Sequence, residues 1–87
     1  DEENISDLSL YPNPTKGMVS IEFSSNHRQK LQVRIVNIIG EEVFVDHLEQ
    51  FVGEYTKQID LSNNTKGIYF LEIETNDGII NKKLILQ

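Results

Sequence analysis

Apolar and polar residues alternate along several short segments of this chain, and this alternation limits the fold more than any other feature. Val19, Ile21 and Phe23 are each separated by one polar residue, and the same period recurs at residues 31–35. A period of two places every apolar side chain on one face of a β-strand. Alanine is absent while isoleucine and valine together number 17, which also favours strands over helices.

Turn-forming residues separate these alternating segments. Gly40 indicates a tight hairpin, and Asp77-Gly78 is typical of a type I′ hairpin turn. Residues 24–29 are polar and predict a connection between strands. The pattern predicts about seven strands: six at residues 8–11, 17–23, 31–35, 54–61, 69–73 and 79–86, and one that resumes at Val43 and Val45 in a tight hairpin over residues 38–45.

Seven short strands with turns between them predict an all-β fold, a two-sheet antiparallel β-sandwich. One domain at residues 8–87 accounts for this pattern. Residues 1–7 hold four of the 14 acidic residues, and we expect them to form a flexible acidic linker.

The segment at residues 46–55 does not follow the alternation. Leu48, Phe51, Val52 and Tyr55 have the spacing of one helical face. Gly53 interrupts this short run, so a loop leading into a strand is favoured, with a helical turn as the alternative.

The composition argues against several classes of function. Cysteine is absent, the two histidines lie in segments that read as polar loops, and no metal-binding or nucleophile motif occurs. We therefore expect no enzyme activity, no catalytic residue, no cofactor and no metal site. The net charge of −6 and the lack of a basic stripe argue against nucleic acid, and no apolar run is long enough for membrane insertion.

A proline-rich segment precedes the second predicted strand. Pro14 restricts both its own backbone and that of Asn13, while Pro12 stiffens the start of the loop. Gly17 permits a positive φ before the strand. The segment is either a stiff turn alone or a preformed recognition loop, which would lose little entropy on binding.

A second motif opens the strand predicted at residues 69–73. Lys66 and Gly67 form the end of a turn, and Tyr69 follows. The Tyr69 ring can enter the core while its hydroxyl reaches back to the backbone near Leu61, as in a tyrosine corner. Ile68 and Phe70 point to the opposite face, where they predict an apolar patch.

The last predicted strand carries Lys82, Lys83, Leu84, Ile85 and Leu86. If this strand lies at a sheet edge, its backbone can accept a partner strand, including that of a second copy in an edge-strand dimer. The alternative is a central strand buried on both faces, with the lysines protecting it against aggregation.

The ordered motifs together resemble the C-terminal sorting domains of proteins exported by the type IX secretion system of Bacteroidetes. The resemblance extends over residues 8–87 and rests on YPNPTKG, VSIEF, VRIVNIIGEEV, IDLSNNTKGIYFLEI and the closing KKLILQ. The family pattern falls on Pro12, Asn13, Pro14, Gly17, Gly40, Lys66, Gly67, Tyr69 and residues 82–86.

The resemblance implies an immunoglobulin-like sandwich of about seven strands that acts as a secretion signal for a cargo domain upstream. It implies translocon and sortase proteins as partners, passage through the periplasm, and a final location at the cell surface or outside the cell. It also places a cleavage region within residues 1–7 and machinery recognition near the final strands. Alternative functions are a carbohydrate-binding or adhesive module and a structural spacer between domains. The module is disfavoured because tryptophan and a calcium-binding acidic run are absent.

Overall fold

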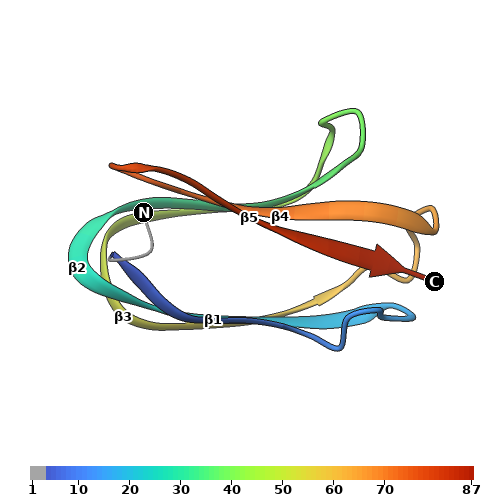
Figure 1. The fold of residues 1–87 in the computed structure, drawn as a ribbon, viewed down its shortest axis with the longest axis horizontal. Coiled ribbons are helices and arrows are strands. Elements are labelled where there is room, and N and C mark those ends of the chain that lie inside the picture. Colours follow the sequence, from blue (N-terminus) through green and yellow to red (C-terminus); the bar gives the residue numbers. More distant parts are fainter. Residues whose placement is uncertain (1–3) are drawn as a thin grey trace.

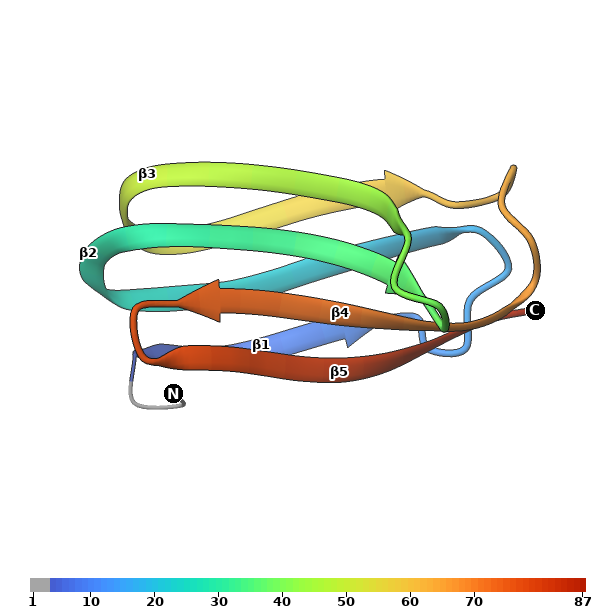
Figure 2. The ribbon, with the colours of Figure 1, turned by 90° about the horizontal axis from the view of Figure 1, so that it is seen from above.

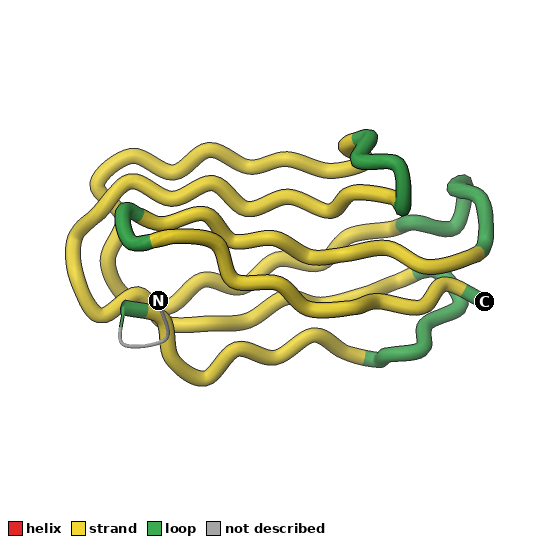
Figure 3. Tube along the Cα trace, turned by 45° about the horizontal axis from the view of Figure 1, so that its top comes forward, coloured by secondary structure: helices red, strands yellow, loops and turns green. Residues whose placement is uncertain are grey.

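The computed structural model describes residues 4–87, which form an all-β, antiparallel fold (Figure 3). Every described element is a strand, a turn or a loop, and no helix that could cross a membrane occurs in this range. The strands are β1 (Ile5–Tyr11), β2 (Met18–Asn37), β3 (Glu42–Asp60), β4 (Gly67–Thr75) and β5 (Gly78–Leu86).

All five strands belong to one sheet in which the 20-residue β2 is central. The strand order is β1-β2-β4-β5, and β3 pairs with the other side of β2. The first half of β2 lies beside β1, as in the pair Leu10–Ile21, and its second half lies beside β4, as in the pair Ile35–Leu71. Since β3 follows β2 through both halves, β2 and β3 form a long two-stranded ribbon (Figure 2).

This ribbon bends back on itself, so that the single sheet curls into a half-barrel with two facing layers (Figure 1). The pairing between β2 and β3 shifts register on both sides of Gln29, which marks irregular backbone at the bend. On β3, Gln50 and Gly53 have φ angles of 50° and 101° in the same region. Such bulges increase the local twist and bend of a strand.

Polar side chains fill the inside of the bend. Ser25 and Gln29 are both buried, and Gln29 Nε2 donates a hydrogen bond to Ser25 Oγ at 3.0 Å. Ser25 Oγ in turn donates to the backbone oxygen of His27 at 2.8 Å. Because each buried polar group has a partner, the bend does not carry the cost of an unsatisfied donor or acceptor.

The prediction of an immunoglobulin-like sandwich of seven strands is therefore wrong, although the all-β, antiparallel class is confirmed. Residues 24–29 do not connect two strands but form the bend of β2, and residues 46–55 continue β3 as neither a helical turn nor a loop. His27 and His47 accordingly lie on strands. The sequence prediction treated polar residues and glycine as breaks, whereas the paired backbone continues through them.

The first strand begins earlier than predicted. Ile5 opens β1, pairs with Ser25 and is only 4% exposed, so residues 5–7 belong to the folded sheet. Of the rest of the expected flexible linker, Asn4 lies in a turn and residues 1–3 lie outside the described residues.

Both predicted hairpins are present. Asn37 closes the turn between β2 and β3 by accepting a hydrogen bond from Gly40 N at 3.0 Å. The β4–β5 turn consists of Asn76 and Asp77, since Thr75 already pairs with Gly78. The expected type I′ turn centred on Asp77-Gly78 is therefore wrong by one residue, and the positive φ is found only at Gly78, 139°.

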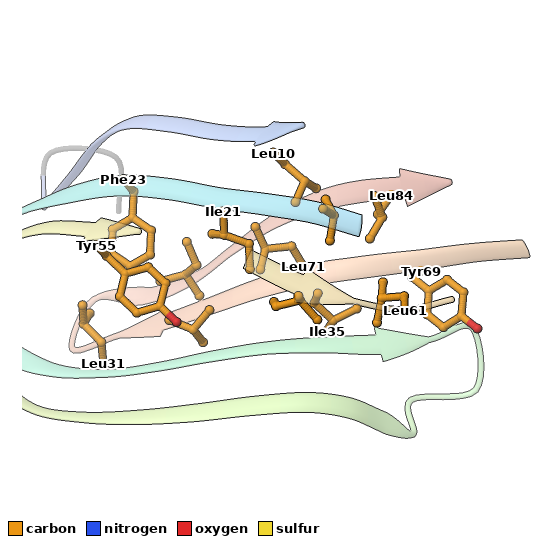
Figure 4. Close-up of a cluster of buried hydrophobic side chains, with 14 of the residues drawn as sticks. Leu10, Ile21, Phe23, Leu31, Ile35, Tyr55, Leu61, Tyr69, Leu71 and Leu84 are labelled. Atoms are coloured by element: carbon orange, nitrogen blue, oxygen red, sulfur yellow. The ribbon is translucent and has the colours of Figure 1, made fainter. Parts of the chain in front are cut away.

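The core lies inside the curl and is built from the inward faces of all five strands (Figure 4). Near the bend, Phe23 stacks on Tyr55 with ring centroids 4.8 Å apart, and Phe51 meets the same ring edge-on. Tyr55 donates its hydroxyl hydrogen to Asp46 Oδ2 at 2.7 Å. Burial, this hydrogen bond and the charge of Asp46 raise the pKa of Tyr55 above its ordinary value.

Replacing Gly53 tests whether the bend depends on backbone conformation. No atom lies within 4 Å of the position a Cβ would take, so the substitution Gly53→Ala meets no steric contact and acts through the φ of 101° alone. We expect Gly53→Ala to lower the free energy of unfolding by about 1 kcal/mol or more in urea denaturation. D-alanine, introduced by chemical synthesis, favours positive φ and should be tolerated; equal losses for both would contradict this explanation.

Candidate functional site

The last strand, β5, lies at the edge of the sheet and is firmly held there. It pairs with β4 along its whole length, from the pair of Leu86 with Gly67 to the pair of Gly78 with Thr75. Leu84 and Leu86 point into the core and are 0% and 2% exposed. The alternative of a central strand is therefore wrong, since among residues 4–87 β4 is the one named strand that pairs with β5.

The loop between β1 and β2, residues 12–17, crosses the outer edge of β5, and we call it the strap (Figure 2). Thr15 N donates a hydrogen bond to the oxygen of Ile85 at 2.9 Å, and Gln87 N donates to the oxygen of Thr15 at 2.8 Å. These bonds form a short parallel bridge between Thr15 and Leu86. The strap thus behaves as a very short extra strand.

The side chain of Asn13 extends this bridge by imitating a peptide group. Its Nδ2 donates to the oxygen of Lys83 at 2.7 Å, and its Oδ1 accepts from Ile85 N at 3.1 Å. Pro12 and Pro14, both preceded by cis peptide bonds, have no N–H to offer at this edge. An asparagine side chain carries both a donor and an acceptor and can replace the missing backbone groups.

The end of the strap is anchored by Thr15 and Gly17. Thr15 is only 2% exposed; its Oγ1 accepts a hydrogen bond from Gly17 N at 3.1 Å and donates to the oxygen of Met18. Gly17 does not have the positive φ that the sequence suggested. It is required instead by close approach, because a Cβ there would lie 3.0 Å from Cβ of Ser62.

The second motif, Lys66-Gly67-x-Tyr69, lies next to the end of β5. Lys66 Nζ donates to the oxygen of Gln87 at 3.1 Å. Gly67 has a φ of 149° and pairs with Leu86. Tyr69 is buried, and its hydroxyl donates a hydrogen bond back to the preceding backbone, to the oxygen of Thr65 rather than near Leu61 as expected.

The structure therefore brings most of the predicted residues together at one end of the molecule. The strap, the Lys66–Tyr69 turn and the final residues of β5 are in direct contact there. Lys82 is one position beyond the stretch that the strap contacts. Sequence reasoning missed Thr15 and Gln87, because their roles depend on pairing between segments about 70 positions apart.

Apolar side chains lie on the outer face beside this end. Ile68 pairs with Ile85 across β4 and β5, and Phe70 is half-buried next to them, so the expected patch is present. Ile38 and Ile39, at the β2–β3 turn, are largely exposed. These isoleucines and Ile68 line an open groove of about 490 Å³ between that turn and the start of β4.

Residues 4–87 contain no cluster of three or more His, Cys, Asp or Glu side chains arranged to hold a metal ion. The arrangement described above is instead a set of backbone edges, lysines and apolar side chains. Exposed backbone edges beside apolar side chains are a kind of surface to which an extended polypeptide can bind.

Residues 9–87 match the family described as "Secretion system C-terminal sorting domain". The chain therefore belongs to this family, the non-catalytic C-terminal sorting domains of the type IX secretion system. It is also 31% identical over 88 residues to the ulvan lyase NLR42 of Nonlabens ulvanivorans. That match covers 99% of this chain but only 15% of the lyase, so the chain spans a small fraction of that relative.

Asn13→Ala tests the bond between the strap and β5. We expect the loss of about 1 kcal/mol of stability, because Lys83 O and Ile85 N–H lose their partner. Hydrogen exchange should show reduced protection of the Ile85 amide, while the Leu84 amide, bonded to β4, stays protected. Asn63→Ala, on an exposed loop, is the matched control; unchanged protection of Ile85 in Asn13→Ala would refute the role of the strap.

Tyr69→Phe tests the hydroxyl contact to Thr65. We expect a loss of about 1 kcal/mol in the free energy of unfolding, because the carbonyl of Thr65 loses its donor. The control is Tyr11→Phe, because Tyr11 is 45% exposed and its hydroxyl donates a hydrogen bond to Glu22 on the surface. The control should change stability by less than about 0.5 kcal/mol, and equal effects of the two substitutions would argue against a special role for Tyr69.

Proposed function

We propose that this chain is a secretion signal that directs a larger, attached cargo protein through the outer-membrane translocon of the type IX secretion system. The observation that carries the proposal is the family match over residues 9–87 together with the surface that unites the family's motifs at one end of the sheet. The cargo passes through the periplasm and ends at the cell surface or outside the cell.

Recognition uses the strap, the Lys66–Tyr69 turn and β5. These segments are held by backbone hydrogen bonds and by the buried Leu84 and Leu86, so the surface is formed before binding. A preformed surface loses little conformational entropy when a partner docks. The apolar patch of Ile68, Phe70 and Ile85 adjoins it and adds contact area.

After export, a cell-surface sortase removes the domain by cleaving within or before residues 1–7. β1 begins at Ile5, so a cut that leaves the sheet intact falls on the N-terminal side of that residue. The ulvan lyase relative suggests an enzyme as the type of cargo.

A carbohydrate-binding module is not favoured by any feature of the described residues. Binding to sugar rings commonly uses several exposed aromatic side chains in one plane. Within residues 4–87, Tyr11 is the exposed aromatic residue, and the other tyrosines and the phenylalanines are buried or half-buried.

A reporter fusion tests the proposal. A periplasmic reporter that ends in residues 1–87 should reach the medium or cell surface of a bacterium with a type IX system. The same fusion should remain in the periplasm of a translocon-deletion strain, as should the reporter without the tail in the parent strain. Export that is independent of the translocon, or periplasmic retention in the parent strain, would refute the proposed function.

A further inference from the structure

The outer edge of β5 is divided into a covered half and an open half. Strand alternation directs the backbone groups of Ile79, Asn81, Lys83, Ile85 and Gln87 to this edge. The strap takes the oxygen of Lys83, both backbone groups of Ile85 and the N–H of Gln87. Among residues 4–87, no backbone group pairs with Ile79 or Asn81 on this side, because β5 pairs with β4 alone and the strap ends at Lys83.

Space is available beside the open half. β1 lies across from it, but a bulge between Ser6 and Ser9, with Asp7 at a φ of 58°, interrupts the regular course of β1. An open groove of about 410 Å³ separates the two strands and is lined by residues 5–8 and 80–82. The described strands thus leave an accessible edge along β5.

The charge of this edge differs from that of the chain as a whole. The chain has a net charge of −6, yet β5 carries Lys82 and Lys83 and no acidic residue. Both lysines are exposed and form no ion pair with the described residues. Asp7, on the opposite side of the groove, is the acidic side chain that lines it.

These observations indicate which kind of partner can bind at the open half of the β5 edge. An open edge accepts an extended strand through backbone hydrogen bonds, and flanking lysines favour carboxylate side chains on that strand. The β5 strand of a second copy carries no acidic residue, so it offers these lysines no carboxylate from its own strand.

We propose that the open half of the β5 edge, at Ile79 and Asn81, receives an extended acidic strand of a type IX secretion protein, which lengthens the sheet. The proposal rests on the proposed secretion function and specifies how the machinery holds the domain. The strap sets the limit of this docking site by sealing the edge from Lys83 onward.

Asn81→Pro tests the backbone interaction. The Asn81 N–H points away from β4, so proline removes the donor that a partner strand needs without removing a bond to β4. Asn81→Thr, which keeps the N–H, is the matched control. In the native cargo protein, we expect Asn81→Pro to slow export about tenfold while Asn81→Thr exports normally.

The Asn81→Pro and Asn81→Thr variants should have the same midpoint of urea unfolding, and this result would exclude a folding defect as the cause of slow export. If Asn81→Pro folds and exports at the wild-type rate, strand addition at this edge is refuted. If the proline variant is unstable, the lysine variants below decide the question, because charge changes at exposed positions leave stability nearly unchanged.

Lys82→Glu with Lys83→Glu separates docking from protection against aggregation. A charged edge resists aggregation with either sign, so glutamates would serve that purpose as well as lysines. Docking of an acidic strand needs the positive sign, so we expect the glutamate pair to retain cargo in the periplasm and an arginine pair to export it. Normal export of the glutamate pair would overturn the proposal.

These outcomes are distinct from failure of the proposed function. If the unmodified protein is not exported by the translocon, the secretion function itself fails. If it is exported and the Asn81→Pro and glutamate variants are exported equally well, the function stands and the edge-docking proposal alone is refuted.

Discussion

The pairing of β2 with three other strands is the constraint on which the rest of the structure depends. Its 20 residues contact β1 and β4 in succession on one side and β3 on the other. A slip of one residue would turn β2 side chains such as Ile21 and Ile35 away from the core in both layers at once. The bend near Gln29 must therefore preserve the inward alternation on each side, which it does.

The strap solves a problem that this curled sheet creates. A half-barrel leaves free edges, and an exposed edge strand promotes unwanted pairing. At β5 the chain covers half of its own edge with Thr15 and the side chain of Asn13. The two prolines make this a poor segment for continued strand pairing, so the covering stops after a short bridge.

Alternation predicted the paired segments and the inward residues well, because burial of one strand face is a local property of the sequence. Val19, Ile21 and Phe23 are all buried, as expected. The breaks were predicted poorly at residues 24–29 and 46–55, where the partner strand and buried side chains satisfy polar groups that suggested loops. The strap was predicted as stiff, but nothing local identifies its partner, which lies about 70 positions away.

Segments that are distant in the sequence come together at one end of this domain, and this affects what a binding partner can recognise. The strap, the Lys66–Tyr69 turn and the end of β5 meet only when the sheet has formed. A peptide with the sequence of β5 alone would lack both the β4 pairing that extends it and the strap that limits its free edge. Under the function proposed above, a machinery protein that binds this end would bind folded sorting domains in preference to unfolded chains.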